Sequence, residues 1–113
     1  MSDQNCIFCK IANKEIPSNL ILETEDYVAF HDLNPQAPVH VLVIPKKHYN
    51  SLNSADEPEL LGRLLIGAKN VAQKLNIENG YRVVLNTGEK AGQTVFHIHL
   101  HVLGGRPMLW PPG

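Results

Sequence analysis

Three histidines alternate with apolar residues in the segment 96–103, which reads Phe-His-Ile-His-Leu-His-Val-Leu. In an extended strand, alternate side chains share a face and lie about 6.6 Å apart. The row on one face would be His97, His99 and His101, and the other face would carry Phe96, Ile98, Leu100 and Val102. The row could be a solvated polar face, a metal site, or a catalytic site in which imidazole acts as nucleophile, general acid or orienting group.

Cys6 and Cys9 are the only cysteines, and their spacing is C-x-x-C. Such a pair can be half of a metal site, a redox pair, or two thiols without a role. A redox pair usually follows a strand and opens a helix, and no apolar strand precedes Cys6. Because the first residues carry no apolar signal region, we expect a reducing, cytoplasmic environment in which a structural disulfide is disfavoured.

The loop before the histidines offers hydrogen-bond donors. It joins two segments expected to pair as antiparallel strands, so the hairpin should bring Asn86, Gln93 and Thr94 close to the start of the row. Gly88 and Gly92 permit a close approach of backbone to ligand. Amide, hydroxyl and N–H donors beside imidazoles suit a phosphate oxyanion. An ordinary polar hairpin loop would have the same composition.

The elements that must position these residues follow from hydrophobic periodicity and turn signals. A short helix is predicted over residues 6–14, with apolar side chains on one side. Strands are predicted at 20–23 and 27–32, which form a hairpin, and at 40–44, 81–85 and 95–103. The segment 34–38 is expected to be a rigid loop because its two prolines disfavour helix.

One long amphipathic helix is predicted in the middle of the chain. Ser54 and Glu57 have the spacing of a capping box, and Pro58 is compatible with a first turn. Apolar residues then recur with helical period from Leu60 to Leu75. The elements together predict an α+β fold: an antiparallel sheet of about five strands, one long helix and one short helix, with the apolar side of the histidine strand against the long helix.

Composition and charge exclude several classes of protein. The 113 residues have the length of one domain, and their 43% hydrophobic and 19% charged content is that of a globular protein rather than a collagenous, disordered or disulfide-rich one. With 10 basic and 11 acidic residues, the net charge is −1, which lacks the basic footprint of a nucleic-acid-binding protein. No apolar run approaches the roughly 20 residues that cross a membrane. We therefore expect neither nucleic acid nor membrane as a partner.

These motifs resemble the histidine triad (HIT) family of nucleotide-binding proteins. His97-Ile98-His99-Leu100-His101-Val102-Leu103 is similar to its H-φ-H-φ-H-φ-φ signature, and Gly92-Gln93-Thr94 precedes it as G-Q-S/T does there. The segments 32–40 and 43–48 are similar to the first half of that family. The ending 103–113, with Trp-Pro-Pro-Gly, resembles the Hint branch in particular.

The resemblance implies a single HIT domain over residues 1–113 in a homodimer, with the sheet joined across the dimer into a larger one. It implies a purine nucleoside phosphoramidase, which converts adenosine 5′-phosphoramidate and related compounds to the nucleoside monophosphate. His99 would be the nucleophile and form a nucleotidyl-imidazole intermediate, which water hydrolyses. The tail 104–113 would lie at the partner's active site, where Trp110 influences the choice of leaving group; a tail that caps its own core is the alternative.

The resemblance also implies roles for the surrounding residues. Asp32 would bind the ribose hydroxyls, although on its own it reads as a carboxylate at the end of a hairpin. His40 would support the nucleophile, and His97 and His101 would complete the catalytic set. The residues implied in phosphate binding or assistance to the leaving group are Asn86, Gly92, Gln93, Thr94 and His101, beside His99. His31 is expected to have no role.

Zinc is the cofactor that the resemblance implies. Many family members bind it through two cysteines and two histidines, which correspond here to Cys6, Cys9, His48 and His97. A Cys₂His₂ set fits a tetrahedral structural zinc that is not required for the chemistry. Other Hint members lack the cysteines, and there the two histidines serve in a proton relay.

Three other functions compete with the phosphoramidase. One is a nucleotide-binding module that acts through partners with slow turnover. Another is a dinucleoside polyphosphate hydrolase or nucleotidylyl transferase of the same fold. The third is a metalloenzyme that holds its metal on the three strand histidines.

Overall fold

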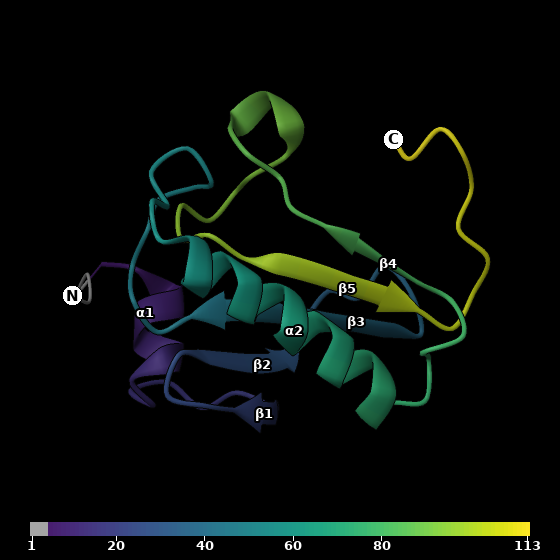
Figure 1. Ribbon diagram of the computed structural model, residues 1–113, viewed down its shortest axis with the longest axis horizontal. Helices are drawn as coiled ribbons and strands as arrows, with labels where there is room; N and C mark the ends of the chain where they lie inside the picture. Colours follow the sequence, from purple (N-terminus) through teal and green to yellow (C-terminus); the bar gives the residue numbers. More distant parts are fainter. Residues whose placement is uncertain (1–4) are drawn as a thin grey trace.

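The computed structural model describes residues 5–113 as one antiparallel sheet with two helices (Figure 1). The sheet has the strand order β1-β2-β3-β5-β4, and every neighbouring pair is antiparallel. The elements are α1 (Ile7–Ala12), β1 (Leu20–Glu23), β2 (Tyr27–His31), β3 (Val39–Pro45), α2 (Pro58–Lys74), β4 (Tyr81–Val84), the short 3₁₀ helix Glu89–Ala91, and β5 (Leu100–Gly104). The predicted α+β fold is confirmed.

The two helices cover opposite faces of the sheet. On one face, Leu64, Ala68 and Val71 of α2 pack against β2, β3 and β5. On the other, Phe8 and Ile11 of α1 pack against alternate residues of β2 and β3. The central strands are therefore buried on both sides, and α1 lies at the end of the sheet where β3 ends (Figure 1). Among the described residues, no helix is long and apolar enough to cross a membrane.

The histidine strand is shorter than the prediction of 95–103. Pairing between β3 and β5 stops at Val43 and Leu100. Continuing that register would place Pro45 opposite Ile98, and proline has no N–H to donate to a ladder. The Ile98 N–H instead donates to the Tyr49 carbonyl at 2.7 Å. Of the three triad histidines, only His101 belongs to the sheet.

The bend before β5 also corrects the predicted position of Phe96. That side chain was expected to face the long helix, but it is 47% exposed and lies beside Cys6 and His48. The rest of the alternation holds, because Ile98, Leu100 and Val102 are buried. Leu100 and Val102 belong to the core cluster that includes α2.

The predicted capping box at the start of α2 is wrong. The N-cap residue is Glu57, and its side chain makes no capping hydrogen bond. Its carboxylate is instead occupied by Lys47 at 2.6 Å and by the Tyr49 hydroxyl. The Ser54 hydroxyl donates to the Ser51 carbonyl in the preceding loop. Tertiary contacts of Glu57 thus replace the local cap.

Candidate active site and metal centre

His99 lies between α1 and the sheet with a defined ring orientation. Its Nδ1 is 2.8 Å from the His97 carbonyl oxygen, and a carbonyl can only accept. Nδ1 therefore carries the proton in the neutral ring, and Nε2 carries a lone pair. The edge of the Phe8 ring packs against the imidazole at a centroid distance of 5.1 Å. His99 thus has the orientation and tautomer of an imidazole nucleophile.

Burial favours the neutral form of His99 and His101. It lowers the pKa of His99, and the backbone hydrogen bond to His97 and the Asp32 carboxylate only partly oppose the effect. Burial also lowers the pKa of His101 to about 4, with the positive charge that His99 and His40 would carry acting in the same direction. At neutral pH the lone pairs of these rings are therefore available for bonding or attack.

A hollow of about 270 Å³ lies beside His99 and His101. Asp32 and Thr94 supply further polar groups on its lining. The rest of the wall is apolar and comes from α1, β2 and neighbouring residues: Ile7, Phe8, Ile11, Phe30, Leu33, Leu42 and Val95. An apolar pocket with a few polar groups at one place is typical of a small-molecule site. Its composition suits a ligand with a flat apolar ring and a polar phosphate end.

The second row of polar groups runs from Asp32 through His40 to His101. The His40 Nε2 is 2.9 Å from His101 Nδ1 and 3.4 Å from a carboxylate oxygen of Asp32. Burial lowers the pKa of His40, and Asp32 acts in the opposite direction. Asp32 directly follows β2, and its N–H donates to the His40 carbonyl of β3 at 2.9 Å. His101 of β5 pairs with Leu42, two residues from His40 on the same strand.

Other predicted ligand-binding residues lie outside this hollow. Gln93 is 2% exposed, and its amide makes three internal bonds, to the Gly88 N–H and to the carbonyls of Asn50 and Val95. Asn86 and Gly92 adjoin one another but do not line the hollow beside His99. Gly92 has a φ of 95°, which favours glycine. The structure therefore gives Gln93 a role in bracing the loop.

The Trp110 side chain is not covered by the core of its own chain. The tail runs outward after β5 (Figure 1), and the Trp110 side chain is 82% exposed. Arg82 holds the tail by donating to the Leu109 carbonyl at 2.9 Å. The tail does not cap the core of its own chain.

Cys6, Cys9, His48 and His97 meet between α1, the end of β3 and the segment before β5. Their ligand atoms all lie within 4.8 Å of one another, and the two cysteines form no disulfide. The Cys9 Sγ is 3.2 Å from His48 Nδ1 and 3.5 Å from His97 Nδ1. In a tetrahedral zinc site, bonds of about 2.3 Å to sulfur and 2.1 Å to nitrogen would separate such ligands by about 3.6 Å.

The outer partners of the two histidines support a metal. His97 donates from Nε2 to the Pro45 carbonyl at 2.8 Å, and His48 donates from Nε2 to Asn50 Oδ1 at 2.8 Å. Both neutral rings therefore present a bare Nδ1 to the cluster, and these atoms lie 3.1 Å apart. Two lone pairs that face each other would be stabilised by a cation between them, and oriented histidines are typical of zinc sites. The residues present fit a zinc ion.

Several residues of the site carried no signal in the sequence. In the sequence, Phe8 is one apolar residue of a predicted helix, and no pattern predicted its contacts with His97 and His99. The carbonyl of Pro45 is a backbone group that no side-chain pattern reveals. Asn50 follows His48 by two residues, which is the one clue that the sequence held.

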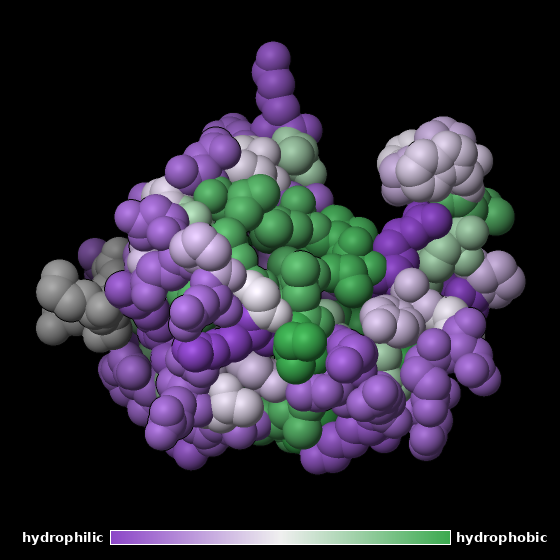
Figure 2. Space-filling model, in the orientation of Figure 1, coloured by the Kyte–Doolittle hydropathy of each residue, from purple (hydrophilic) through white to green (hydrophobic). Residues whose placement is uncertain are grey.

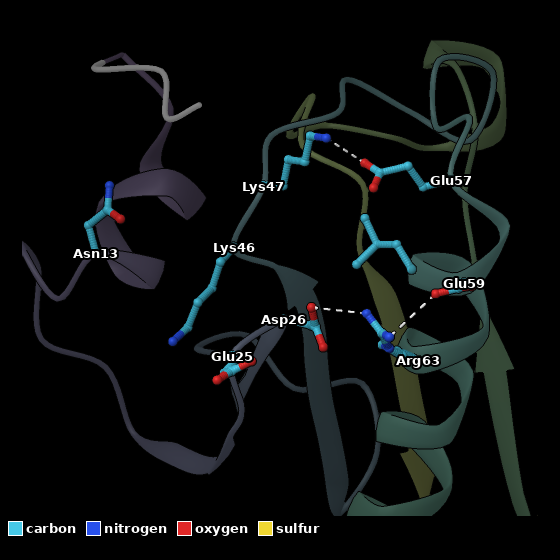
Figure 3. A pocket seen from close by; sticks show the side chains of 9 residues that line it. Asn13, Glu25, Asp26, Lys46, Lys47, Glu57, Glu59 and Arg63 are labelled. Carbon is cyan, nitrogen blue, oxygen red and sulfur yellow. Dashed lines mark hydrogen bonds and ion pairs between the residues drawn. The ribbon is translucent and has the colours of Figure 1, made fainter.

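A larger hollow of about 460 Å³ lies away from the triad (Figure 3). Its charged side chains are largely paired: Lys47 with Glu57, and Arg63 with Asp26 and Glu59. Such pairs on an open surface are solvated and contribute little to stability. His99 and His101 line the smaller hollow and not this one.

Known proteins resemble this chain along nearly its whole length. A family model described as HIT domain matches residues 13–108. The Zea mays protein named 14 kDa zinc-binding protein is 51% identical over 117 residues, which cover 100% of this chain and 91% of that protein. The Arabidopsis thaliana protein named Adenylylsulfatase HINT1 is 47% identical over 116 residues, which cover 99% and 79%. The crystal structure of a HIT family hydrolase from Legionella pneumophila Philadelphia 1 has a TM-score of 0.93 and 52% identity, and the match covers 96% of this chain and 100% of that one.

Proposed function

Since the chain belongs to the HIT family and to its Hint branch, we propose that it hydrolyses purine nucleoside phosphoramidates to nucleoside monophosphates. The observation that carries the proposal is the orientation of His99. Its Nδ1 proton is held by the His97 carbonyl, so its Nε2 lone pair is available beside a hollow that also contains Asp32 and Thr94.

The reaction has two steps. The Nε2 lone pair of His99 forms a bond to the α-phosphorus, and the P–N bond breaks as the amine leaves with a proton. Water then attacks the phosphorus, the N–P bond to His99 breaks, and nucleoside monophosphate is released. Two displacements replace one direct attack of water on a negatively charged phosphorus, which is the benefit of a covalent intermediate.

The other residues of the hollow serve binding and proton transfer. Asp32 accepts hydrogen bonds from the ribose hydroxyls, and the apolar wall contacts the purine. Thr94 and His101 bind the phosphate. Asn86 and Gly92 assist from the adjoining loop, which the buried Gln93 amide holds in place. The backbone carbonyl of His97 orients the nucleophile. His40, which was expected to support the nucleophile itself, lies 2.9 Å from His101 and supports that residue instead. A donor to the developing phosphate charge typically contributes about 10²-fold or more in rate.

We further propose that Cys6, Cys9, His48 and His97 hold a structural zinc. The name of the Zea mays relative and the facing Nδ1 atoms of the two histidines support this assignment. The ion would connect α1 to the end of β3 and to the segment before β5. It would take no part in the phosphorus chemistry.

A homodimer of this single domain, residues 1–113, is also part of the proposal. The edge strand β4 has a neighbour on one side only, and hydrophobic side chains gather on the face where α2 lies (Figure 2). Leu65 and Ile66 of α2 are exposed there. The exposed Trp110 and the rest of the tail 104–113 would contact the partner's active site. With no basic excess in the chain, we expect no nucleic-acid partner. A cytoplasmic location without a membrane partner is likewise part of the proposal.

The test is release of AMP from adenosine 5′-phosphoramidate by the purified, zinc-loaded protein. We expect His99→Ala to lose more than about 10³-fold in kcat, because the covalent route disappears. His31→Ala, in β2, should retain wild-type turnover. A chelator should not reduce initial turnover, whereas loss with the metal would point to a metalloenzyme.

The same experiment separates the alternatives. Adenosine 5′-phosphosulfate belongs in the panel because the Arabidopsis relative is named an adenylylsulfatase. A dinucleoside polyphosphate cleaved faster than either compound would contradict the phosphoramidase. A wild-type dimer that binds AMP but cleaves none of these substrates would be a binding module. Sedimentation measures the dimer directly, and a monomer at working concentration would contradict that part of the proposal.

A further inference from the structure

Arg106 is joined to the triad by a continuous set of hydrogen bonds. Its Nε and one terminal nitrogen both donate to the Gln36 carbonyl, at 3.2 and 3.1 Å. On the other side of the same residue, the Gln36 N–H donates to His40 Nδ1 at 3.0 Å. His40 Nε2 lies 2.9 Å from His101 Nδ1. The path leads from the C-terminal segment to the hollow beside His99.

The backbone amide decides where the protons lie along this path. A backbone N–H is always a donor, so His40 Nδ1 must carry a lone pair. Neutral His40 therefore has its proton on Nε2 and donates it to His101. The same argument then applies to His101, whose Nδ1 accepts and whose proton is on Nε2. Asp32 competes for the His40 proton only from 3.4 Å.

The loop that supplies the amide is held from two directions. Pro35 and Pro38 restrict its backbone. Gly105, which has a φ of 89°, lies so close to Pro38 that a Cβ on it would be 2.9 Å from the proline Cβ. Arg106 therefore approaches the loop directly and fixes the carbonyl of Gln36. The Gln36 side chain is not needed for this, because it donates to the Asn34 carbonyl.

We propose that Arg106 is a positioning residue that, through Gln36 and His40, holds His101 as the Nε2–H tautomer. The inference rests on the proposed function for its consequence: a His101 with hydrogen on Nε2 donates to phosphate or leaving group. The other tautomer would present a lone pair to a negative ligand. The C-terminal segment thus sets the hydrogen-bonding character of the active site of its own chain.

The experiment compares Arg106→Met with Arg82→Met by ¹⁵N NMR of the histidine ring nitrogens in the zinc-loaded protein. Both arginines donate to backbone carbonyls: Arg82 of β4 to Leu109 in the C-terminal segment, and Arg106 of that segment to Gln36. In the wild type and in Arg82→Met, His40 and His101 should each show one protonated Nε2 and one bare Nδ1. In Arg106→Met, the shifts of these two rings should move toward the averaged values of mixed tautomers.

Two further variants keep the test decisive. Gln36→Ala retains the backbone groups and should retain the wild-type signature. Arg106→Lys keeps the charge but loses the fork that gives two bonds, so its signature should lie between those of the wild type and Arg106→Met. It replaces Arg106→Met if that variant does not fold. An unchanged signature in both Arg106 variants would overturn the proposal.

Turnover supplies the functional measurement. We expect Arg106→Met to lower kcat about 10-fold with little change in KM, below the roughly 10²-fold that misplaced groups can cost. Arg63→Met, at the distant charged hollow, should leave turnover unchanged. If the wild type does not cleave the phosphoramidate, the proposed function fails, while the ring-nitrogen signatures still test the role of Arg106.

Discussion

Each histidine of the two clusters has one ring nitrogen committed to a fixed partner. His97 and His48 use Nε2 for the Pro45 carbonyl and the Asn50 side chain, and His99 uses Nδ1 for the His97 carbonyl. Because the ring is rigid, fixing one nitrogen also fixes the direction in which the other nitrogen points. In a neutral imidazole one nitrogen carries the proton and the other a lone pair. The fixed partners therefore decide that His48 and His97 present Nδ1 to the metal cluster, whereas His99 presents Nε2 to the proposed substrate.

The lowered pKa of His101 predicts a pH dependence of stability. Burial holds that pKa near 4, so the folded protein keeps the ring neutral while the unfolded chain takes up a proton below about pH 6.5. The free energy of unfolding should therefore fall as the pH falls from about 6.5 to about 4. Urea unfolding at fixed zinc across this range should give a shallower dependence for His101→Gln than for the wild type.

His31→Gln is the matched control for that measurement, since it removes a histidine outside both clusters. It should keep the wild-type slope. If His101→Gln and His31→Gln show the same slope, burial of His101 does not contribute to the pH dependence.

At the scale of elements, local signals located the helices and strands but not all of their ends. Predicted strand 20–23 matches β1 and strand 81–85 exceeds β4 by one residue. The predicted helix 6–14 is shorter in the structure, because Cys6 is the N-cap and Asn13 the C-cap of α1. The largest difference is β5, which starts at Leu100 because Pro45 cannot extend the ladder. The predicted end of an element is wrong where a residue distant in sequence takes the hydrogen bond of its backbone or of its cap.

Two glycines of α2 give a prediction about packing at this scale. A Cβ at Gly67 would lie 2.9 Å from the Tyr27 ring, whereas a Cβ at Gly62 would meet nothing within 4 Å. Both changes to alanine improve helix propensity by up to about 1 kcal/mol. We expect Gly62→Ala to raise the free energy of unfolding and Gly67→Ala to lower it by roughly 1–3 kcal/mol through overpacking. Urea unfolding of the two variants measures the difference in sign.

At the scale of the whole molecule, the Cys₂His₂ cluster connects parts that are far apart in the chain. α1 supplies Cys9, the segment after β3 supplies His48, and the segment before β5 supplies His97. The six residues of α1 are too few to be stable as an isolated helix. Packing of Phe8 and Ile11 together with the cluster therefore holds α1 against the sheet.

We accordingly predict that metal removal loosens the molecule without abolishing its chemistry. The purified protein should contain one zinc per chain, and chelation should lower the thermal midpoint by several degrees because the ion binds only the folded site. Cys9→Ser should lose the zinc, and a chelator should then have no further effect on its midpoint. A wild type without zinc, or one whose midpoint does not respond to chelation, would contradict the structural role.

Local sequence patterns were enough to predict the elements of this chain and the residue types at its candidate sites. Period-two histidines, the C-x-x-C pair, the loop donors and the long amphipathic helix are local patterns, and local patterns specify faces, elements and ligand types. They predicted the α+β sheet correctly. The set Cys6, Cys9, His48 and His97 was implied by the resemblance to the HIT family rather than by a local pattern, and the structure brings these residues together.

Tertiary structure alone decided how each group is oriented. The partner of His97 Nε2 is 52 residues away, and Arg106 acts on Gln36 across 70 residues. The fold also uses the Gln93 amide to hold the loop, although the motif Gly92-Gln93-Thr94 predicted a phosphate-binding role. Backbone carbonyls and amides supply most of these partners, and every residue carries them, so no residue type reveals them. Only the folded register determines which backbone group meets which ring nitrogen, and that contact sets the tautomer on which the chemistry depends.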